Sequence, residues 1–255
     1  MQRNDQTLLF SLAVGTAGSL LAAAIMTLLQ GSSLWVGGML SVAFVISLSQ
    51  VFILRTRLRT LNRLGIRRWE QTLSVGTNTQ DCIKLSQRNL CFLGIAATKW
   101  LADPNAFRQM LLRHATNGGQ ANFLLLHPDS EACREFEAIK QRASGSLNKR
   151  IRENAVALLK LREDHFRINV RFYSDHPRFR IVIVDDIMIA LGLYSYVSEF
   201  GDDSPQLILD SAPRPWSYYY AFNAFFTNLW ERSVNAETCL ETNILNPKAG
   251  MSRNA

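Results

Sequence analysis

The chain has 255 residues, of which 47% are hydrophobic, and 28 basic against 21 acidic residues give a formal net charge of +7. The apolar residues are unevenly spread, because no Asp, Glu, Lys or Arg occurs from Gln6 to Leu54. This distribution excludes one evenly mixed globular domain and divides the chain near residue 55. Four widely spaced cysteines, without any C-x-x-C pair, indicate neither a disulfide framework nor a zinc site; they are Cys82, Cys91, Cys133 and Cys239.

The uncharged stretch is long enough for two membrane crossings, since a hydrocarbon core of about 30 Å requires about 20 apolar residues as helix. A polar turn at residues 30–33 would separate a first helix at 7–29 from a second at 34–54. A cleavable signal peptide is the alternative for the first segment, but it would have a shorter apolar core and a more basic start. The sequence therefore predicts a two-helix transmembrane hairpin over residues 1–54.

Small residues recur every four positions in both predicted helices. Such a stripe lets helices approach closely in lipid, either within one hairpin or between copies that self-associate. Its members are Ser11, Gly15, Ser19, Ala23, Gly37 and Ser41. No ionisable residue lies within either span, which disfavours a transporter.

An arginine cluster follows the second predicted helix. Positive residues beside a membrane end stay cytoplasmic, so both termini of this multi-pass protein of the cell inner membrane are expected in the cytoplasm. The cluster would contact anionic headgroups of the lipid bilayer, and it consists of Arg55, Arg57, Arg59, Arg63, Arg67 and Arg68. Direct nucleic-acid binding is the alternative, but no aromatic interleaving indicates it.

Residues 55–87 are predicted as a basic juxtamembrane connector, and residues 88–234 as a cytoplasmic α/β domain with a mixed sheet. A strand at 89–96, a helix that begins at Asp103-Pro104 and a strand at 121–126 have the length of a crossover between parallel strands. Further helices are predicted at 131–142, 147–163 and 216–230, and further strands at 168–173, 180–185, 187–193 and 206–210. A turn between two antiparallel strands is expected at Asp185-Asp186. Residues 235–255 are predicted to form a flexible tail.

Three segments of the predicted α/β domain carry a family resemblance. FLGI at 92–95, LLLHPDS at 124–130 and RFRIVIVDD at 178–186 follow one another in an order that resembles one half of a phospholipase D-type fold. In that family, His-x-Lys followed by four residues and Asp begins this hairpin; the His is the nucleophile and the Lys holds phosphoryl oxygens. Here Arg178 and Arg180 take those positions, and Asp185 is kept.

Arginine stays protonated and cannot attack phosphorus, so the resemblance implies a degenerate site without phospholipase-type catalysis. Arg178 and Arg180 are possible phosphate-binding residues, because a guanidinium group can bind phosphate through two parallel N–H···O hydrogen bonds. The structural alternative is that both arginines lie in solvent or pair with Asp175, Asp185 or Asp186.

Other motifs do not indicate catalysis. The sequence has no Walker loop, no dinucleotide fingerprint and no metal-ligand spacing, so no catalytic residue, cofactor, metal or enzyme activity is predicted. His127 beside Asp129 is an acid–base candidate, and the aromatic block 216–230 is a base-stacking candidate. A structural or packing role is favoured for both.

The whole arrangement resembles the two-transmembrane effectors of bacterial retron anti-phage defence systems. That resemblance implies an effector kept silent by a partner complex, a reverse transcriptase with its RNA-linked DNA. On activation it would disrupt the inner membrane and cause abortive infection. The alternatives are a membrane-anchored phosphodiesterase or nuclease of phospholipase D-like fold, and a non-toxic membrane tether.

Overall fold

The computed structural model describes residue 25 and residues 34–70, 76–162, 164–194, 204–211 and 216–245. The chain divides into two compact units, residues 1–62 and residues 63–255. In the first unit the structure describes most of helix α2 (Leu34–Arg63). The remaining elements belong to the second unit.

An eight-stranded mixed sheet forms the centre of the second unit, with the strand order β1-β7-β6-β5-β2-β3-β4-β8. Strands β2, β3 and β4 run parallel to one another, and every other neighbouring pair is antiparallel. The strands are β1 (Ile66–Glu70), β2 (Asn89–Gly94), β3 (Gln120–Leu126), β4 (Ile168–Tyr173), β5 (Phe179–Val184), β6 (Met188–Leu193), β7 (Gln206–Asp210) and β8 (Val234–Asn235). The predicted α/β domain with a mixed sheet is confirmed.

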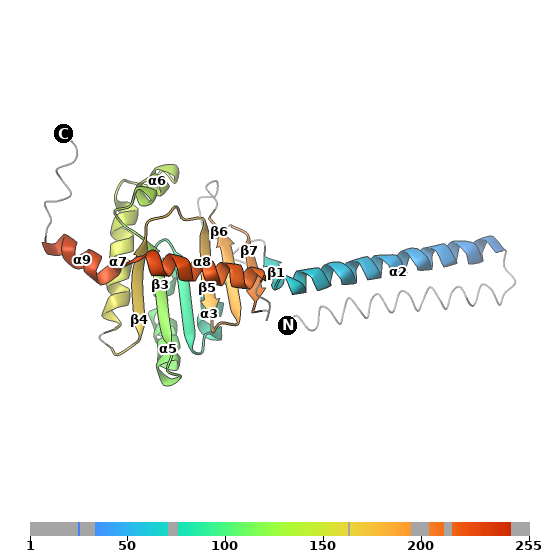
Figure 1. Ribbon diagram of the computed structural model, residues 1–255, viewed down its shortest axis with the longest axis horizontal. Helices are drawn as coiled ribbons and strands as arrows, with labels where there is room; N and C mark the ends of the chain where they lie inside the picture. Colours follow the sequence, from blue (N-terminus) through green and yellow to red (C-terminus); the bar gives the residue numbers. More distant parts are fainter. Residues whose placement is uncertain are drawn as a thin grey trace. The chain divides into compact units, whose positions relative to one another are not determined.

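Helices cover both faces of this sheet. Helix α8 (Tyr218–Arg232) crosses one face (Figure 1), where Phe222 packs edge-on against Phe179 of β5. On the other face, Trp100 and Phe107 pack against Phe123 of β3. The other helices are α3 (Thr79–Leu85), α4 (Thr98–Leu101), α5 (Pro104–Thr116), α6 (Glu131–Ile139), α7 (Ser146–Lys160) and α9 (Ala236–Leu245). The core therefore has two layers, one on each side of the sheet.

Local signals explain where several elements begin and end. Asp103 caps α5, because its carboxylate accepts a hydrogen bond from the backbone N–H of Ala106. Pro104 occupies the first turn, where a helix does not need the N–H that proline lacks. The turn between β5 and β6 places Asp185 and Asp186 at φ 49° and 57°, as a type I′ hairpin requires. Both features confirm the predicted boundaries.

Several elements lie where the sequence analysis expected none, and β1 and α9 are two of them. Strand β1 pairs antiparallel with β7 and lies inside the segment predicted as a connector. Helix α9 lies inside the segment predicted as a tail, and its Glu237 forms an ion pair with Arg162. Both elements are held by partners distant in sequence, which local periodicity does not reveal.

The predicted transmembrane hairpin is wrong by the structure. Within the part of the chain that the structure describes, no helix combines the length and the apolarity that a bilayer crossing requires. The predicted first span, 7–29, lies outside the described residues except for residue 25. The second span corresponds to the start of α2, which continues to Arg63.

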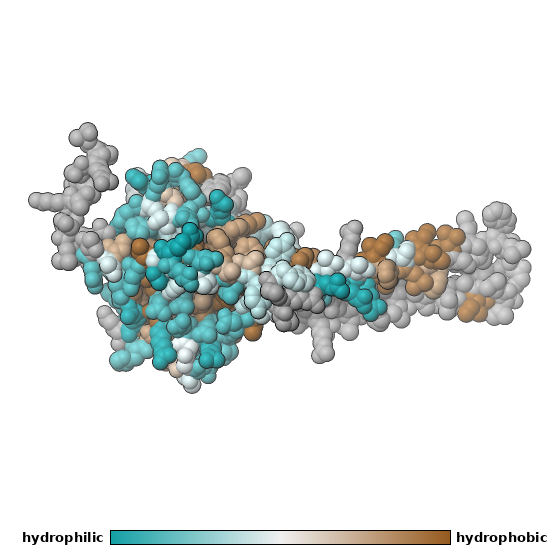
Figure 2. Space-filling view, viewed as in Figure 1, coloured by the Kyte–Doolittle hydropathy of each residue, from teal (hydrophilic) through white to brown (hydrophobic). Residues whose placement is uncertain are grey.

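The helix that contains the second predicted span does not end with its apolar residues, because α2 runs on to Arg63 and carries arginines from Arg55 onward. Apolar side chains are exposed along α2 (Figure 2), and Phe52 is 70% exposed. The predicted inner-membrane location, with both termini cytoplasmic, is corrected with the hairpin, and membrane disruption by that hairpin loses its basis.

Candidate functional site

A row of four residues crosses one face of the sheet near the start of β5. The strand register pairs Arg180 with Gly192, Gly192 with Gln206, and Gln206 with Glu70. Residues in register on neighbouring strands point to the same face. Because side chains alternate along β5, this face is opposite to the one on which Phe179 meets α8. The row joins β5, β6, β7 and β1 at one end of the sheet.

Gly192 leaves the space that Arg180 uses. A Cβ at Gly192 would lie 3.5 Å from Nε of Arg180, so the arginine side chain passes directly over this glycine. Its Nη2 then donates a hydrogen bond of 3.0 Å to Oε1 of Gln206. The Gln206 side chain belongs to a residue that is only 1% exposed, so this bond holds a half-buried guanidinium in one position.

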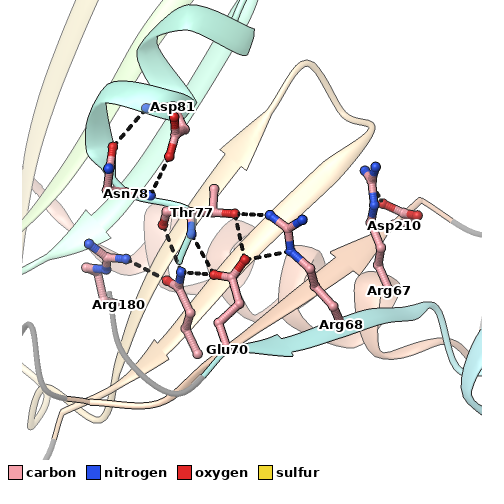
Figure 3. Close-up of polar contacts among 9 residues, drawn as sticks. Arg67, Arg68, Glu70, Thr77, Asn78, Asp81, Arg180 and Asp210 are labelled. Carbon is pink, nitrogen blue, oxygen red and sulfur yellow. Dashed lines mark hydrogen bonds and ion pairs between the residues drawn. The ribbon is translucent and has the colours of Figure 1, made fainter. Parts of the chain in front are cut away.

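The carboxylate of Glu70 lies at the other end of the row (Figure 3). It accepts a bond of 2.7 Å from the backbone N–H of Thr77 and one of 2.9 Å from the Thr77 hydroxyl. It also accepts a hydrogen bond from Nε2 of Gln206 and forms an ion pair of 2.5 Å with Nε of Arg68. Both carboxylate oxygens are therefore engaged twice, and β1 is tied to the loop that precedes α3.

These contacts determine the charge of Glu70. Burial alone would raise its pKa, but the hydrogen bonds from Thr77 and Gln206 and the charge of Arg68 outweigh burial and hold the pKa below its usual value. Glu70 is thus ionised at neutral pH and uses its lone pairs within the protein. It is poorly suited to act as a general base.

The nucleophilic groups near Arg180 are held in their protonated forms. Burial raises the pKa of the Cys82 thiol to about 12, although the charge of Arg180 acts in the opposite direction. Burial likewise raises the pKa of Tyr194 to about 12, again against the influence of Arg180. Thr77 is 4% exposed, and its hydroxyl donates to Glu70. None of these three groups is available as an anion for attack on phosphorus.

The structure places Arg178 and Arg180 in different surroundings. Arg178 is exposed immediately before β5, and its backbone carbonyl accepts the N–H of Tyr194. Arg180 is half-buried in the row described above. Because the Arg178 carbonyl continues the pairing with β6, extended backbone would place its side chain on the same side as that of Arg180, two residues later. Asp185, which the resemblance placed in the same motif, lies at the far end of the hairpin and accepts backbone N–H groups of Gln87, Arg88 and Asn89.

The members of the predicted arginine cluster lie on α2 and on β1. Arg55, Arg59 and Arg63 are exposed on α2, which also contains Arg57. Arg67 lies 3.4 Å from Asp210, and Arg68 belongs to the Glu70 network. Gly37 and Ser41 of the predicted small-residue stripe lie in α2. The other members of the stripe, Ser11, Gly15, Ser19 and Ala23, lie outside the described residues.

His127 cannot serve as the acid–base group considered from the sequence. Its Nδ1 accepts the backbone N–H of Asp129 at 3.1 Å, which places the proton of the neutral ring on Nε2. Nε2 lies 3.3 Å from Sγ of Cys239 and must donate rather than accept there. The Asp129 carboxylate binds Arg152 and Asn148 instead. His127 therefore has a structural role.

The aromatic block packs as predicted. Tyr219 and Phe226 are 4% and 5% exposed, and Phe226 stacks on Trp230 at a centroid distance of 5.9 Å. Its outer members, Trp216, Tyr218 and Tyr220, are exposed. The helix thus uses one aromatic stripe to cover the sheet.

Sequence reasoning missed Glu70, Thr77 and Gln206. One weak signal was present, because Gln206 opens the otherwise apolar strand QLILD and a polar residue at such a position requires a partner. The partner itself was not visible, since Glu70 is 136 positions away in the chain.

No protein-family model matches the sequence, and no curated protein matches it. Among solved structures, TrmBL2, an archaeal chromatin protein with a novel mode of DNA binding, is similar with 9% identity and a TM-score of 0.42, over 73% of this chain and 62% of that one. Nuc from Salmonella typhimurium, a phospholipase D family member, has 11% identity and a TM-score of 0.35, over 61% and 86%. Phosphatidylserine synthase from Haemophilus influenzae has 13% identity and a TM-score of 0.40, over 64% and 38%.

The chain thus spans less than two thirds of TrmBL2 and of the synthase. The phospholipase D family member Nuc is among these neighbours. The resemblance to retron effectors gains no support from these structures.

Proposed function

We propose that this protein binds a phosphate ester at the start of β5 and does not cleave it. The observation that carries this proposal is the placement of Arg178, an exposed arginine on the same side of the strand as the positioned guanidinium of Arg180. Guanidinium groups bind phosphate oxygens through paired N–H donors. Gln206 and Gly192 support the site by holding the Arg180 side chain across β6.

Binding without cleavage follows from the protonation states around Arg180. A phosphodiesterase of this kind requires a nucleophile that is deprotonated at neutral pH or that a neighbouring base can deprotonate. Cys82 and Tyr194 are protonated there, because their pKa values are raised to about 12. Glu70 is ionised, but its oxygens are occupied by Thr77, Gln206 and Arg68. The predicted lack of enzyme activity stays part of this proposal.

The test uses bis(p-nitrophenyl) phosphate and inorganic phosphate with the full-length chain. Release of p-nitrophenolate measures cleavage, and calorimetric titration measures binding of both compounds. We expect saturable binding without cleavage. Arg178→Ala should weaken binding about tenfold, because one charge-assisted phosphate contact is lost.

Arg88→Ala provides the matched control. Arg88 is exposed and immediately precedes β2, which runs antiparallel to β5, so it lies at the opposite end of the same part of the sheet. Its loss changes the net charge equally and should leave binding unchanged. Cleavage by the unmodified chain, or equal weakening by Arg178→Ala and Arg88→Ala, would refute the proposal.

A further inference from the structure

A second polar site lies on the opposite face of the sheet, where β3 and β4 begin. Asn122 and Asn169 are in register on these two neighbouring strands. Gln120 and Arg171 lie two residues away from them along β3 and β4, respectively, and therefore point to the same face. Arg171 contacts Trp230 of α8, so this is the face that α8 covers, away from the row that contains Arg180.

The polar array lines a groove of about 360 Å³. This volume is near the lower end of the range for small-ligand pockets. Farther along the same strands, the residues that point to this face are apolar or aromatic and fully buried, for example Leu124 and Leu126. The apolar residues on this face give way to carboxamide and guanidinium groups where the groove lies. The groove is lined by Gln120, Asn122, Arg162, Asn169, Val170, Arg171, Trp230 and Asn235.

The side chains in the groove are already held in place. Nη2 of Arg171 donates a bond of 2.6 Å to the Ser233 carbonyl, and its Cζ lies 5.4 Å from the centroid of the Trp230 ring. Trp230 in turn stacks on Phe226. Nδ2 of Asn169 donates a bond of 2.9 Å to Oδ1 of Asn122. Such prior ordering lowers the entropic cost of binding a ligand.

The chemistry of the array identifies the class of ligand. Four carboxamides and two guanidinium groups line the groove and offer N–H donors together with carbonyl acceptors. An anion offers only acceptors, so it would leave the carboxamide carbonyl oxygens without a donor. Asn and Gln form bidentate pairs with adenine, and Arg forms them with guanine. Both faces of Trp230 are engaged, by Phe226 and by Arg171, so the ring is not placed to stack on a sugar.

We propose that the β3–β4 groove binds a nucleobase through hydrogen bonds to Asn122, Asn169, Gln120 and Arg171. The base can come from a free nucleoside or nucleotide or from single-stranded nucleic acid, and the recognition chemistry is the same for both. This inference is independent of the proposed phosphate site, because the groove occupies the other face of the sheet and recognises no phosphate.

The experiment titrates the full-length chain with adenosine, guanosine, cytidine and uridine in a calorimeter, followed by short single-stranded homopolymers. Nucleosides carry no phosphate, so a positive result does not depend on Arg178, and Arg178→Ala should leave nucleoside binding unchanged. Binding of nucleosides identifies a site for free bases, and binding of homopolymers alone identifies single-stranded nucleic acid as the source. Either result supports the groove only if the variants below weaken it.

Asn169→Ala and Gln120→Ala should each weaken base binding at least about fivefold, as expected when one bidentate carboxamide contact is removed. Both residues are exposed, so their truncation should preserve folding, which an unchanged urea midpoint verifies. Gln109→Ala is the matched control, because Gln109 is an exposed carboxamide on α5 outside the groove. The proposal is overturned if no nucleoside or homopolymer binds, if all three variants bind equally well, or if methyl glucoside binds more tightly than any nucleoside.

Discussion

Replacing Asp185 with glycine tests how the β5–β6 hairpin is attached to the rest of the sheet. The Asp185 carboxylate accepts backbone N–H groups of Gln87, Arg88 and Asn89, each at 2.7 Å. Two of these bonds are exposed to solvent, so each of the three contributes about 1 kcal/mol, in the middle of the range for net hydrogen-bond contributions. Losing them should lower the free energy of unfolding by about 3 kcal/mol.

The backbone effect of this replacement can be measured separately. Asp186 adopts a positive φ of 57° in the same turn, is exposed, and accepts none of these three bonds. Asp186→Gly therefore changes the same type of residue in the same backbone region without removing the acceptor. We expect its free energy of unfolding to stay within about 0.5 kcal/mol of the unmodified chain.

Urea unfolding followed by circular dichroism provides the measurement. With a slope of about 2–3 kcal/mol per M, the midpoint of Asp185→Gly should fall by about 1 M below that of Asp186→Gly. Equal midpoints for the two variants would refute the assignment of stability to the three Asp185 bonds. Asp185 would then act only through its backbone conformation.

Three further changes have defined outcomes. Burial lowers the pKa of His114 to about 4 from its usual 6.5, so the neutral form is favoured in the folded chain. The contribution of His114 to the free energy of unfolding is therefore full above pH 6.5 and falls as the pH drops from 6.5 through 4. His114→Gln should flatten that part of a curve of unfolding free energy against pH. Gly119→Ala should lower the free energy of unfolding, measured in urea, by more than about 3 kcal/mol, because its Cβ would lie 1.7 Å from the Arg88 carbonyl oxygen. In the control Gly118→Ala the Cβ meets no atom within 4 Å, so the cost should be about 1 kcal/mol for the positive φ. Iodoacetamide at pH 8 should leave Cys82 unmodified in the folded chain, because the thiol is buried and its pKa is raised to about 12; rapid labelling before urea is added would contradict this burial.

Much of the α/β domain was predictable from local pattern. The helix that begins after Asp103 and the hairpin at Asp185-Asp186 depend on a cap and on a turn, which are formed by residues close together in the chain. The buried strands were recognisable as apolar runs, and two pairings, the parallel β2–β3 pair and the antiparallel β5–β6 hairpin, followed from the connections. The membrane hairpin was not confirmed, since no helix among the described residues has the length and apolarity that a crossing requires.

The candidate site was predictable only in part. Arg178 and Arg180 were identified from their spacing before Asp185, but the residues that hold Arg180 were not. Gln206 lies 26 positions away from Arg180 in the chain, and Glu70 lies 136 positions away from Gln206. The β3–β4 groove was likewise invisible, because nothing local to Asn122 indicates that Asn169 lies beside it.

The amino-acid sequence by itself determined most of the central strands and the longer helices of the domain. Periodicity, caps and turn residues act over a few positions, so they can be read along the chain. Only the tertiary structure decided that β1 joins the edge of the sheet, that Arg180 passes over Gly192 to reach Gln206, and that the starts of β3 and β4 remain open as a polar groove. These features depend on which strands pair and which part of a face a helix covers, and that choice is made by burial summed over the whole core.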